Sequence, residues 1–186
     1  MKRTVLIFGL ISGAVSSLLM LATVPFHDRI GFNYGLVLGY TTIVLSFMLV
    51  FFGIRSYRDN VGGGSITFAR AFGLGLLITL VSCLLYVGTW EVIYFKLMPD
   101  FAEKFSKSAV EKVIASGAST EMIEAKVQEM KDLTALLNNP LKNAAMTFME
   151  PFPVGLIVIL ISAAILRKKP APAGQEEEVG APVMSS

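Results

Sequence analysis

The sequence predicts an all-α membrane protein with four transmembrane helices and an extracytoplasmic helical hairpin between the third and the fourth. Charged residues make up only 16% of the 186-residue chain, against roughly 25% in an average globular protein. The charges cluster between apolar runs and leave those runs almost bare. Four of the runs reach the roughly 20 residues that a helix needs to cross a hydrocarbon core.

The four spans and their connections are predicted to form one membrane domain, residues 1–169. The spans are expected at about residues 5–24, 34–54, 71–92 and 147–166, and none holds a charge near its middle. An alternative for the first span is a cleaved signal peptide, because Lys2 and Arg3 precede it. Its apolar run is longer than the usual ~7–15 residues and no small-residue cleavage motif follows before Pro25. We therefore expect an uncleaved helix.

Basic residues beside the spans predict that both ends of the chain are cytoplasmic, since short cytoplasmic connections are rich in Lys and Arg. The first connection, on the opposite side, carries only Arg29 beside Asp28. The clustered bases that this orientation places in the cytoplasm are Lys2, Arg3, Arg55, Arg58, Arg70, Arg167, Lys168 and Lys169. The remaining tail, residues 170–186, is rich in Pro, Ala, Gly and Glu, a composition typical of a disordered segment.

The third connection is the one extramembrane region with a clear helical pattern, at about residues 100–137. Apolar residues recur at helical spacing in two stretches, separated by the break at residues 116–119. Ser119 or Thr120 is expected to cap the second helix, and residues 138–140 (NNP) to end it. The two apolar stripes either pack on each other or lie on the membrane surface. We expect mutual packing, because the polar faces carry balanced charge.

Small residues recur four apart in the first two spans. The rows are Gly9, Gly13 and Ser17, then Gly31, Gly35 and Gly39. Such rows let helix backbones approach each other closely within a bilayer. We expect them to pack helices within one monomer, with a dimer interface as the alternative.

Glu91 and Glu150 are the two acids nearest the membrane, and both are predicted near the extracytoplasmic ends of their spans. Because burying a charge in a bilayer is costly, we expect Glu91 to reach headgroup water; a proton, ion or ligand site is the alternative. Pro151 and Pro153 are expected to begin the fourth helix, where proline is tolerated. A kink that opens a cavity beside Glu150 is the other interpretation.

Other motifs indicate structure rather than chemistry. Gly62, Gly63 and Gly64 are predicted to form a turn before a cap at Ser65 or Thr67, since neither a preceding strand nor a Gly-Lys-Ser/Thr motif marks a phosphate loop. Cys83 and His27 are the only residues of their types. An intrachain disulfide, a thiolate metal cluster and a histidine-rich metal site are therefore excluded, and no cofactor is predicted. The small net charge of +2 gives no reason to expect nucleic acid.

Several short strings together resemble domain-of-unknown-function family 4199. They are residues 53–60 (GIRSYRDN), 63–68 (GGSITF), 71–72 (AF), 100–101 (DF), 116–118 (SGA), 139–141 (NPL) and 152–155 (FPVG). The resemblance implies a small bacterial inner-membrane protein with four spans and brings no established activity or catalytic residue. It draws attention to the cytoplasmic segment at residues 57–59. Basic residues beside the inner leaflet attract anionic headgroups, so Arg55, Arg58 and Arg70 are candidate contacts for anionic lipid.

The function expected from these features is that of a non-enzymatic accessory or scaffold unit, which contacts a membrane or periplasmic partner through its hairpin. An alternative is a small transporter or channel, built as a homo-oligomer around Glu91 or Glu150. An enzyme is not expected, because the spans contain hydroxyl groups without a base to activate them.

Overall fold

The computed structural model describes residues 1–168, and this part of the chain is helical almost throughout. The predicted disordered tail, residues 170–186, lies outside the described residues. The long helices are α1 (Lys2–Thr23), α2 (His27–Asn60), α3 (Phe68–Val92) and α7 (Pro151–Leu166). The shorter segments are η1 (Val24–Phe26), the π-helical turn η2 (Ile93–Leu97), α4 (Phe101–Ala115), α5 (Thr120–Leu137) and α6 (Pro140–Phe148).

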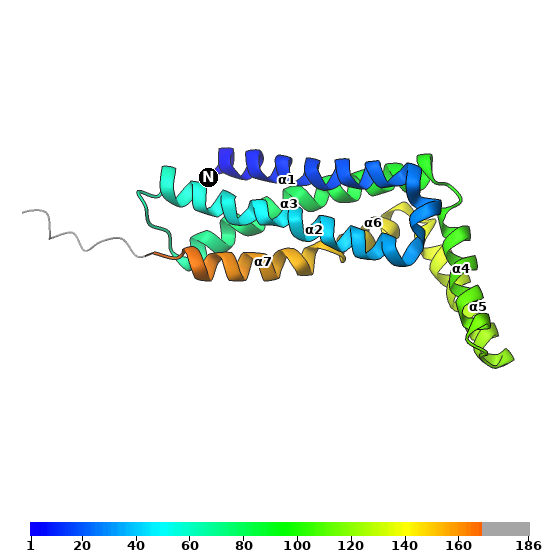
Figure 1. The fold of residues 1–186 in the computed structure, drawn as a ribbon. Helices are drawn as coiled ribbons and strands as arrows, with labels where there is room; N and C mark the ends of the chain where they lie inside the picture. The colour runs from blue at the N-terminus through cyan, green and yellow to red at the C-terminus, as the bar shows by residue number, and fades with distance from the viewer. Residues whose placement is uncertain (169–186) are drawn as a thin grey trace, which may run out of the picture.

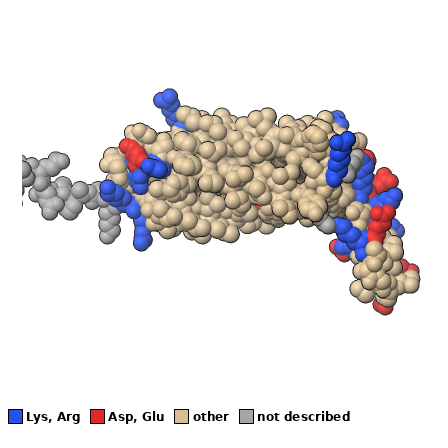
Figure 2. All heavy atoms as spheres, in the orientation of Figure 1, with Lys and Arg blue, Asp and Glu red and all other residues tan. Residues whose placement is uncertain are grey.

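Four helical stretches are long and apolar enough to cross a membrane, which confirms the all-α membrane fold class. They cover Lys2–Phe26, Tyr34–Asn60, Phe68–Leu97 and Pro140–Leu166. These stretches lie side by side as a bundle, and α4 and α5 project together from one end of it at a steep angle (Figure 1). Lys, Arg, Asp and Glu gather at the two ends of the bundle and on the hairpin, and leave the surface between almost uncharged (Figure 2).

The bundle core lies where α2, α3 and α7 meet, and α1 packs against α2 and α3. Ile54, Ile78 and Ile159 contribute fully buried side chains from these three helices. Large apolar side chains such as Leu84 and Ile165 point outward instead, with 69% and 66% of their surfaces exposed. An apolar exterior around an interior held by helix contacts is what a lipid environment requires.

Buried hydroxyl groups connect α1 to its neighbours. Ser12 Oγ donates a hydrogen bond to the carbonyl oxygen of Ser46 on α2, at 2.8 Å. Ser82 Oγ, on α3, donates to the carbonyl oxygen of Gly9, at 3.1 Å. These hydroxyls therefore bind helices together, as polar side chains commonly do within a bilayer.

One end of the bundle, here called the terminal end, contains Met1, the connection from α2 to α3 and the last described residues (Figure 1). Ile66 and Lys168 exchange two backbone hydrogen bonds, at 3.0 and 2.9 Å, which fasten the end of α7 to this connection. Gly63 and Gly64 have positive φ angles, and Thr67 caps α3 by accepting a hydrogen bond from the backbone of Arg70. The predicted turn and the Thr67 cap are therefore present.

The opposite end, here called the hairpin end, contains α4 and α5, which pack along each other. Gly117 has a φ of 74° in the turn between them, and such a left-handed conformation favours glycine. Ser119 caps α5 by accepting a hydrogen bond from the backbone N–H of Met122. The hairpin and its Ser119 cap match the sequence prediction.

The fourth span is interrupted, whereas the sequence indicated one helix over about 147–166. Asn139 caps α6, which begins at Pro140 and ends at Phe148. After a two-residue turn, α7 begins at Pro151. Pro151 and Pro153 have no N–H groups, so the helical hydrogen bonds they would donate to the carbonyls four residues earlier are missing. The prolines thus begin α7, as predicted, and also separate it from α6.

Candidate functional site

A partly enclosed cavity of about 500 Å³ lies at the hairpin end of the bundle. Its walls come from the end of α1, the first half of α2, α3, α6 and the base of the hairpin. The lining is mainly apolar, and includes six aromatic rings: Phe32, Tyr40, Tyr86, Trp90, Phe101 and Phe105. We call this space the aromatic cavity.

Tyr86, Thr147 and Glu150 form what we call the polar corner of the aromatic cavity, and Thr23 and Thr42 add hydroxyl groups to its lining. Tyr86 OH donates a hydrogen bond to Oε2 of Glu150, at 3.2 Å. Glu150 is the one charged side chain in the lining, among the residues whose side chains the structure describes. The cavity therefore combines extensive apolar surface with a single carboxyl group.

The break in the fourth span explains why Glu150 occupies this corner. It directly precedes Pro151, so it lies in the turn between α6 and α7 rather than on the face of a continuous helix. The 16 residues of α7 cover about 24 Å at 1.5 Å per residue. When Leu166 marks one edge of a hydrocarbon core of about 30 Å, Glu150 lies inside the opposite edge.

Asn143 makes hydrogen bonds to several residues in and behind the wall of the cavity. Its side chain is fully buried on α6, and its Oδ1 accepts hydrogen bonds from Trp90 Nε1 at 3.1 Å and from Thr147 Oγ1 at 3.2 Å. Its Nδ2 donates to the carbonyl oxygen of Leu137, at 3.0 Å. One amide therefore connects α3, α5 and α6, and it fixes the orientation of two residues that line the cavity.

Aromatic rings that line the cavity pack the hairpin against the bundle. Phe32, near the start of α2, lies edge-to-face against Phe101 and Phe105 of α4, with ring centroids 5.7 and 5.2 Å apart. Phe101 also lies edge-to-face against Trp90, at 5.1 Å. Because Phe101 and Phe105 belong to the apolar stripe of α4, this stripe packs against the bundle as well as against α5.

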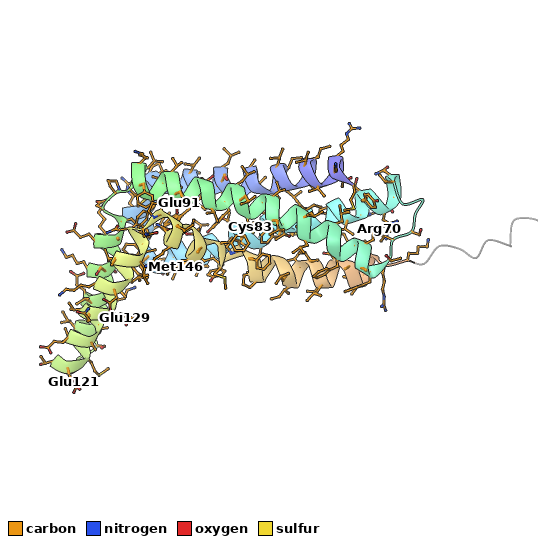
Figure 3. All side chains as sticks on the ribbon, turned by 180° about the vertical axis from the view of Figure 1, so that it is seen from behind. Arg70, Cys83, Glu91, Glu121, Glu129 and Met146 are labelled. Carbon is orange, nitrogen blue, oxygen red and sulfur yellow. The ribbon has the colours of Figure 1, made fainter. Side chains whose placement is uncertain are left out.

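The structure separates the two acids that the sequence singled out. Glu91 does not line the aromatic cavity, whereas Glu150 does. On α3, Glu91 follows Tyr86, the partner of Glu150, by five residues, which corresponds to about 140° of rotation and about 7.5 Å along the axis. Glu91 is partly buried, and its Oε1 has no hydrogen-bond partner among the described residues. Figure 3 shows Glu91 and Met146 at the hairpin end, Cys83 midway and Arg70 at the terminal end.

The two rows of small residues also have different surroundings. A Cβ on Gly9 or Gly13 would lie within 3 Å of Val81 or Leu85 on α3, and Ser17 Oγ accepts a hydrogen bond from Thr89 Oγ1 at 2.8 Å. The first row therefore packs helices within the monomer, as predicted. Cβ atoms on Gly31, Gly35 and Gly39 would meet nothing within 4 Å, and the last two glycines line the aromatic cavity. For the second row, the packing prediction is wrong.

The three candidate lipid-contacting arginines lie at or near the terminal end of the bundle. Arg58 Nε is 2.7 Å from Oδ1 of Asp59, and Arg55 Nε is 3.6 Å from Oδ2 of the same carboxylate. Asp59 thus offsets part of the positive charge that Arg55, Arg58 and Arg70 present there. Their contact with anionic lipid stays a prediction.

Sequence reasoning found Glu150 but missed its partner Tyr86, and it also missed Asn143 and the hydrogen bonds that Asn143 makes behind the cavity wall. Asn143 carried a local signal, because it follows the Pro140 start of a helix that leads directly into the fourth span. An amide there needs partners from other helices. Among the side chains that the structure describes, no group of three or more His, Cys, Asp and Glu residues is placed to hold a metal ion.

Comparison with curated proteins and with solved structures finds no match. A family model described as "Protein of unknown function (DUF4199)" matches residues 7–168. The matched region includes all four helical stretches except the first few residues of α1. The chain therefore belongs to this family, as its sequence motifs predicted.

Proposed function

We propose that this protein is a non-enzymatic membrane protein that binds a small amphipathic molecule in the aromatic cavity. The observation that carries the proposal is a cavity of about 500 Å³ with apolar walls and one polar corner. Small-molecule pockets typically enclose ~300–1,000 Å³ and combine apolar walls with a few convergent polar groups. The described lining contains no Lys, His or Cys, so its polar groups are one carboxyl group and hydroxyl groups without a second acid–base residue, which favours binding over catalysis.

The hairpin has two roles in this proposal. Phe101 and Phe105 on α4, with Leu133 and Leu137 on α5, form part of the cavity wall, so the base of the hairpin retains the ligand. The far tip, around Gly117, is where a partner protein or a second copy would be contacted. A bulky tag inserted at Gly117 should remove a co-purifying partner, and an unchanged set of partners would argue against this second role.

The proposed orientation places the hairpin end, and with it the aromatic cavity, on the extracytoplasmic side of a bacterial inner membrane. The support is the positive charge of Lys2, Arg3, Arg58 and Lys168 toward the terminal end, together with the rule that such charge stays cytoplasmic. A reporter enzyme that requires an extracytoplasmic location should be active when fused after Ser119. Activity of only a cytosolic reporter at this site would overturn the orientation.

A second candidate function is transport by an oligomer, in which Glu150 would bind a proton or an ion. The observation that favours Glu150 over Glu91 is its position on the cavity wall, in the turn between α6 and α7. Purified protein in proteoliposomes should then support an ion or proton flux that Glu150→Gln abolishes. Cross-linking that detects only monomers in native membranes would remove this candidate.

Ligand binding can be measured through Trp90, which lines the cavity and is the only tryptophan. The full-length protein is placed in phosphatidylcholine vesicles and titrated with a dodecanol that carries bromine on its chain, because bromine quenches tryptophan fluorescence on contact. We expect saturable quenching that unlabelled dodecanol reverses.

A matched pair of glycine variants separates the cavity from the general lipid surface. Gly39 lines the cavity and Gly88 does not, and an added Cβ at either position would meet nothing within 4 Å. Gly39→Leu partly fills the cavity and should weaken the saturable quenching, whereas Gly88→Leu should leave it unchanged. Quenching that rises linearly, or that both variants leave intact, would mean that the bromine reaches Trp90 from bulk lipid and would refute the proposed function.

A further inference from the structure

We propose that the aromatic cavity selects a lipophilic ammonium ion, meaning an apolar chain or ring system with one positively charged nitrogen. This inference rests on the proposed function and names the class of ligand. Three features carry it: the unbalanced carboxyl group of Glu150, the aromatic rings that line the same cavity and the apolar extent of the remaining wall.

The described lining of the cavity carries one acidic side chain and no basic one. Glu150 is the one charged side chain in the described lining. Its Oε2 accepts a hydrogen bond from Tyr86 OH, and neither of its oxygens has a Lys or Arg partner within residues 1–168. Glu150 is exposed in the structure rather than buried among protein atoms, so its surroundings in the membrane are set by lipid and by whatever occupies the cavity. Inside a hydrocarbon core, a carboxylate is stable only when it is paired with a cation and hydrogen-bonded. Since the described lining supplies the hydrogen bond and no cation, a ligand with a positive group completes the pair.

The aromatic rings that line the cavity favour the same group. Tyr86 is bonded to the carboxyl group, and Tyr40 and Trp90 also line the cavity. The faces of such rings attract ammonium ions, with Trp the strongest, and aromatic cages are a recurring means of recognising them. An anionic head group would instead meet the Glu150 carboxylate without a basic residue in the described lining to offset the repulsion.

The rest of the wall fits an apolar chain rather than a hydrated inorganic cation. Most of it consists of residues such as Leu19, Ile43, Leu133 and Met146, and its side-chain oxygens beyond Glu150 are neutral hydroxyl groups of Thr and Tyr. Hard metal cations need several oxygen ligands, whereas an ammonium group on a hydrocarbon needs one carboxylate, aromatic faces and an apolar channel. Because the only carboxyl group of the described lining is at one corner and most of the remaining wall is apolar, the ligand is oriented with its nitrogen toward Glu150.

The test compares three molecules with one chain length and different head groups: dodecylamine, dodecanol and dodecanoate. Each competes with the brominated dodecanol for the wild-type protein in vesicles of phosphatidylcholine alone, so that anionic lipid does not concentrate the amine. At neutral pH the amine is protonated, as a lysine side chain is. We expect the amine to compete at about tenfold lower concentration than the alcohol, or ~1.4 kcal/mol, and the carboxylate to be the weakest competitor.

Variants of the two membrane-proximal acids assign this preference to the cavity. Glu150→Gln should bring the amine to the potency of the alcohol while the alcohol still binds, which also reports that the variant is folded. Glu91→Gln, which changes an acid outside the cavity, and Tyr86→Phe, which retains the carboxyl group, should both keep the preference for the amine.

The outcomes distinguish this inference from the proposed function. Equal potency of amine and alcohol in the wild-type protein would overturn the ammonium selectivity and leave amphiphile binding intact. A preference for the amine that persists in Glu150→Gln would also overturn it, since the carboxylate would not be its cause. Failure of all three molecules to compete would refute both. Should Glu150→Gln fail to fold, Glu150→Asp keeps the charge, and loss of the preference in that folded variant would count against the inference as well.

Discussion

Along α1, Gly9 and Gly13 lie against α3, and a Cβ on Gly13 would be 2.6 Å from Cδ1 of Leu85. Along the first half of α2, Gly35 and Gly39 have the same spacing, yet a Cβ on either would meet no atom within 4 Å. One row brings two helices into contact, and the other forms part of a cavity wall. Spacing of small residues therefore does not by itself indicate close helix packing.

The difference comes from what lies opposite each row. α3 is regular along the whole of its contact with α1, so close approach is possible at successive turns. α2 packs on α7, but α7 begins only at Pro151, after the break that separates it from α6. Toward the hairpin end, the space beside α2 is therefore filled only in part, by side chains from the hairpin and from α6.

The sharpest test of this comparison is one bulky side chain in each row. Gly13→Leu should destabilise the protein by about 3 kcal/mol, because overpacking displaces Leu85 and separates α1 from α3. Gly39→Leu should change stability by less than about 1 kcal/mol, a range set by helix propensity alone. The free energy of unfolding of both variants can be measured in mixed micelles of mild detergent and dodecyl sulfate. Equal decreases in stability would show that both rows are in close helix contact.

The wall behind the second row is expected to depend on Asn143. Asn143→Leu removes the acceptor of Trp90 Nε1 and the donor to Leu137 O, and unsatisfied buried groups of this kind cost roughly 1–3 kcal/mol. We expect a loss of about 2 kcal/mol and a shift in the emission of Trp90. Lys142→Leu, one residue earlier on the exposed face of α6, serves as the control. An unchanged Trp90 spectrum in Asn143→Leu would contradict the role assigned to this amide.

Within the second row, Gly31 and Gly35 are predicted to respond in opposite directions to alanine. The helix α2 is kinked at Gly31, which has a φ of 68° and a ψ of 165°. A side chain in this conformation costs about 1–2 kcal/mol. Gly35 is within a regular helix, where alanine is favoured over glycine by roughly 0.5–1 kcal/mol. Gly31→Ala should lower the free energy of unfolding and Gly35→Ala should raise it. The same sign for both would mean that the kink at Gly31 is not needed.

The smallest expected effect concerns the hydroxyl at the end of the first row. Ser17→Val removes the hydrogen bond between Ser17 and Thr89, and such bonds between membrane helices average about 0.6 kcal/mol. Thr41→Val is the matched change on α2, where the hydroxyl bonds only within its own helix, to the carbonyl of Val37. Stability measured as above should fall for Ser17→Val and stay nearly constant for Thr41→Val. A larger loss for Thr41→Val would reverse the comparison.

Much of the fold was predictable because the relevant signals are local. Hydropathy identified the four spans, and Ser119 and Thr67 act as the caps that their positions indicated. The interruption before Pro151 was visible as an alternative, since two prolines remove two helical hydrogen bonds. A cavity beside Glu150 was part of that alternative, but the hydrogen bond from Tyr86 was not visible, because Tyr86 is 64 residues away in the chain.

By itself, the sequence determined which segments are apolar enough for lipid, where the turns lie and to which family the chain belongs. These properties depend on single residues and their neighbours in the chain, so they can be inferred without knowledge of the fold. The tertiary structure alone decided that Glu150 faces a cavity while Glu91 does not, and that one glycine row packs while the other lines a space. Both depend on which helix lies opposite, and that is set by the joint packing of all the spans.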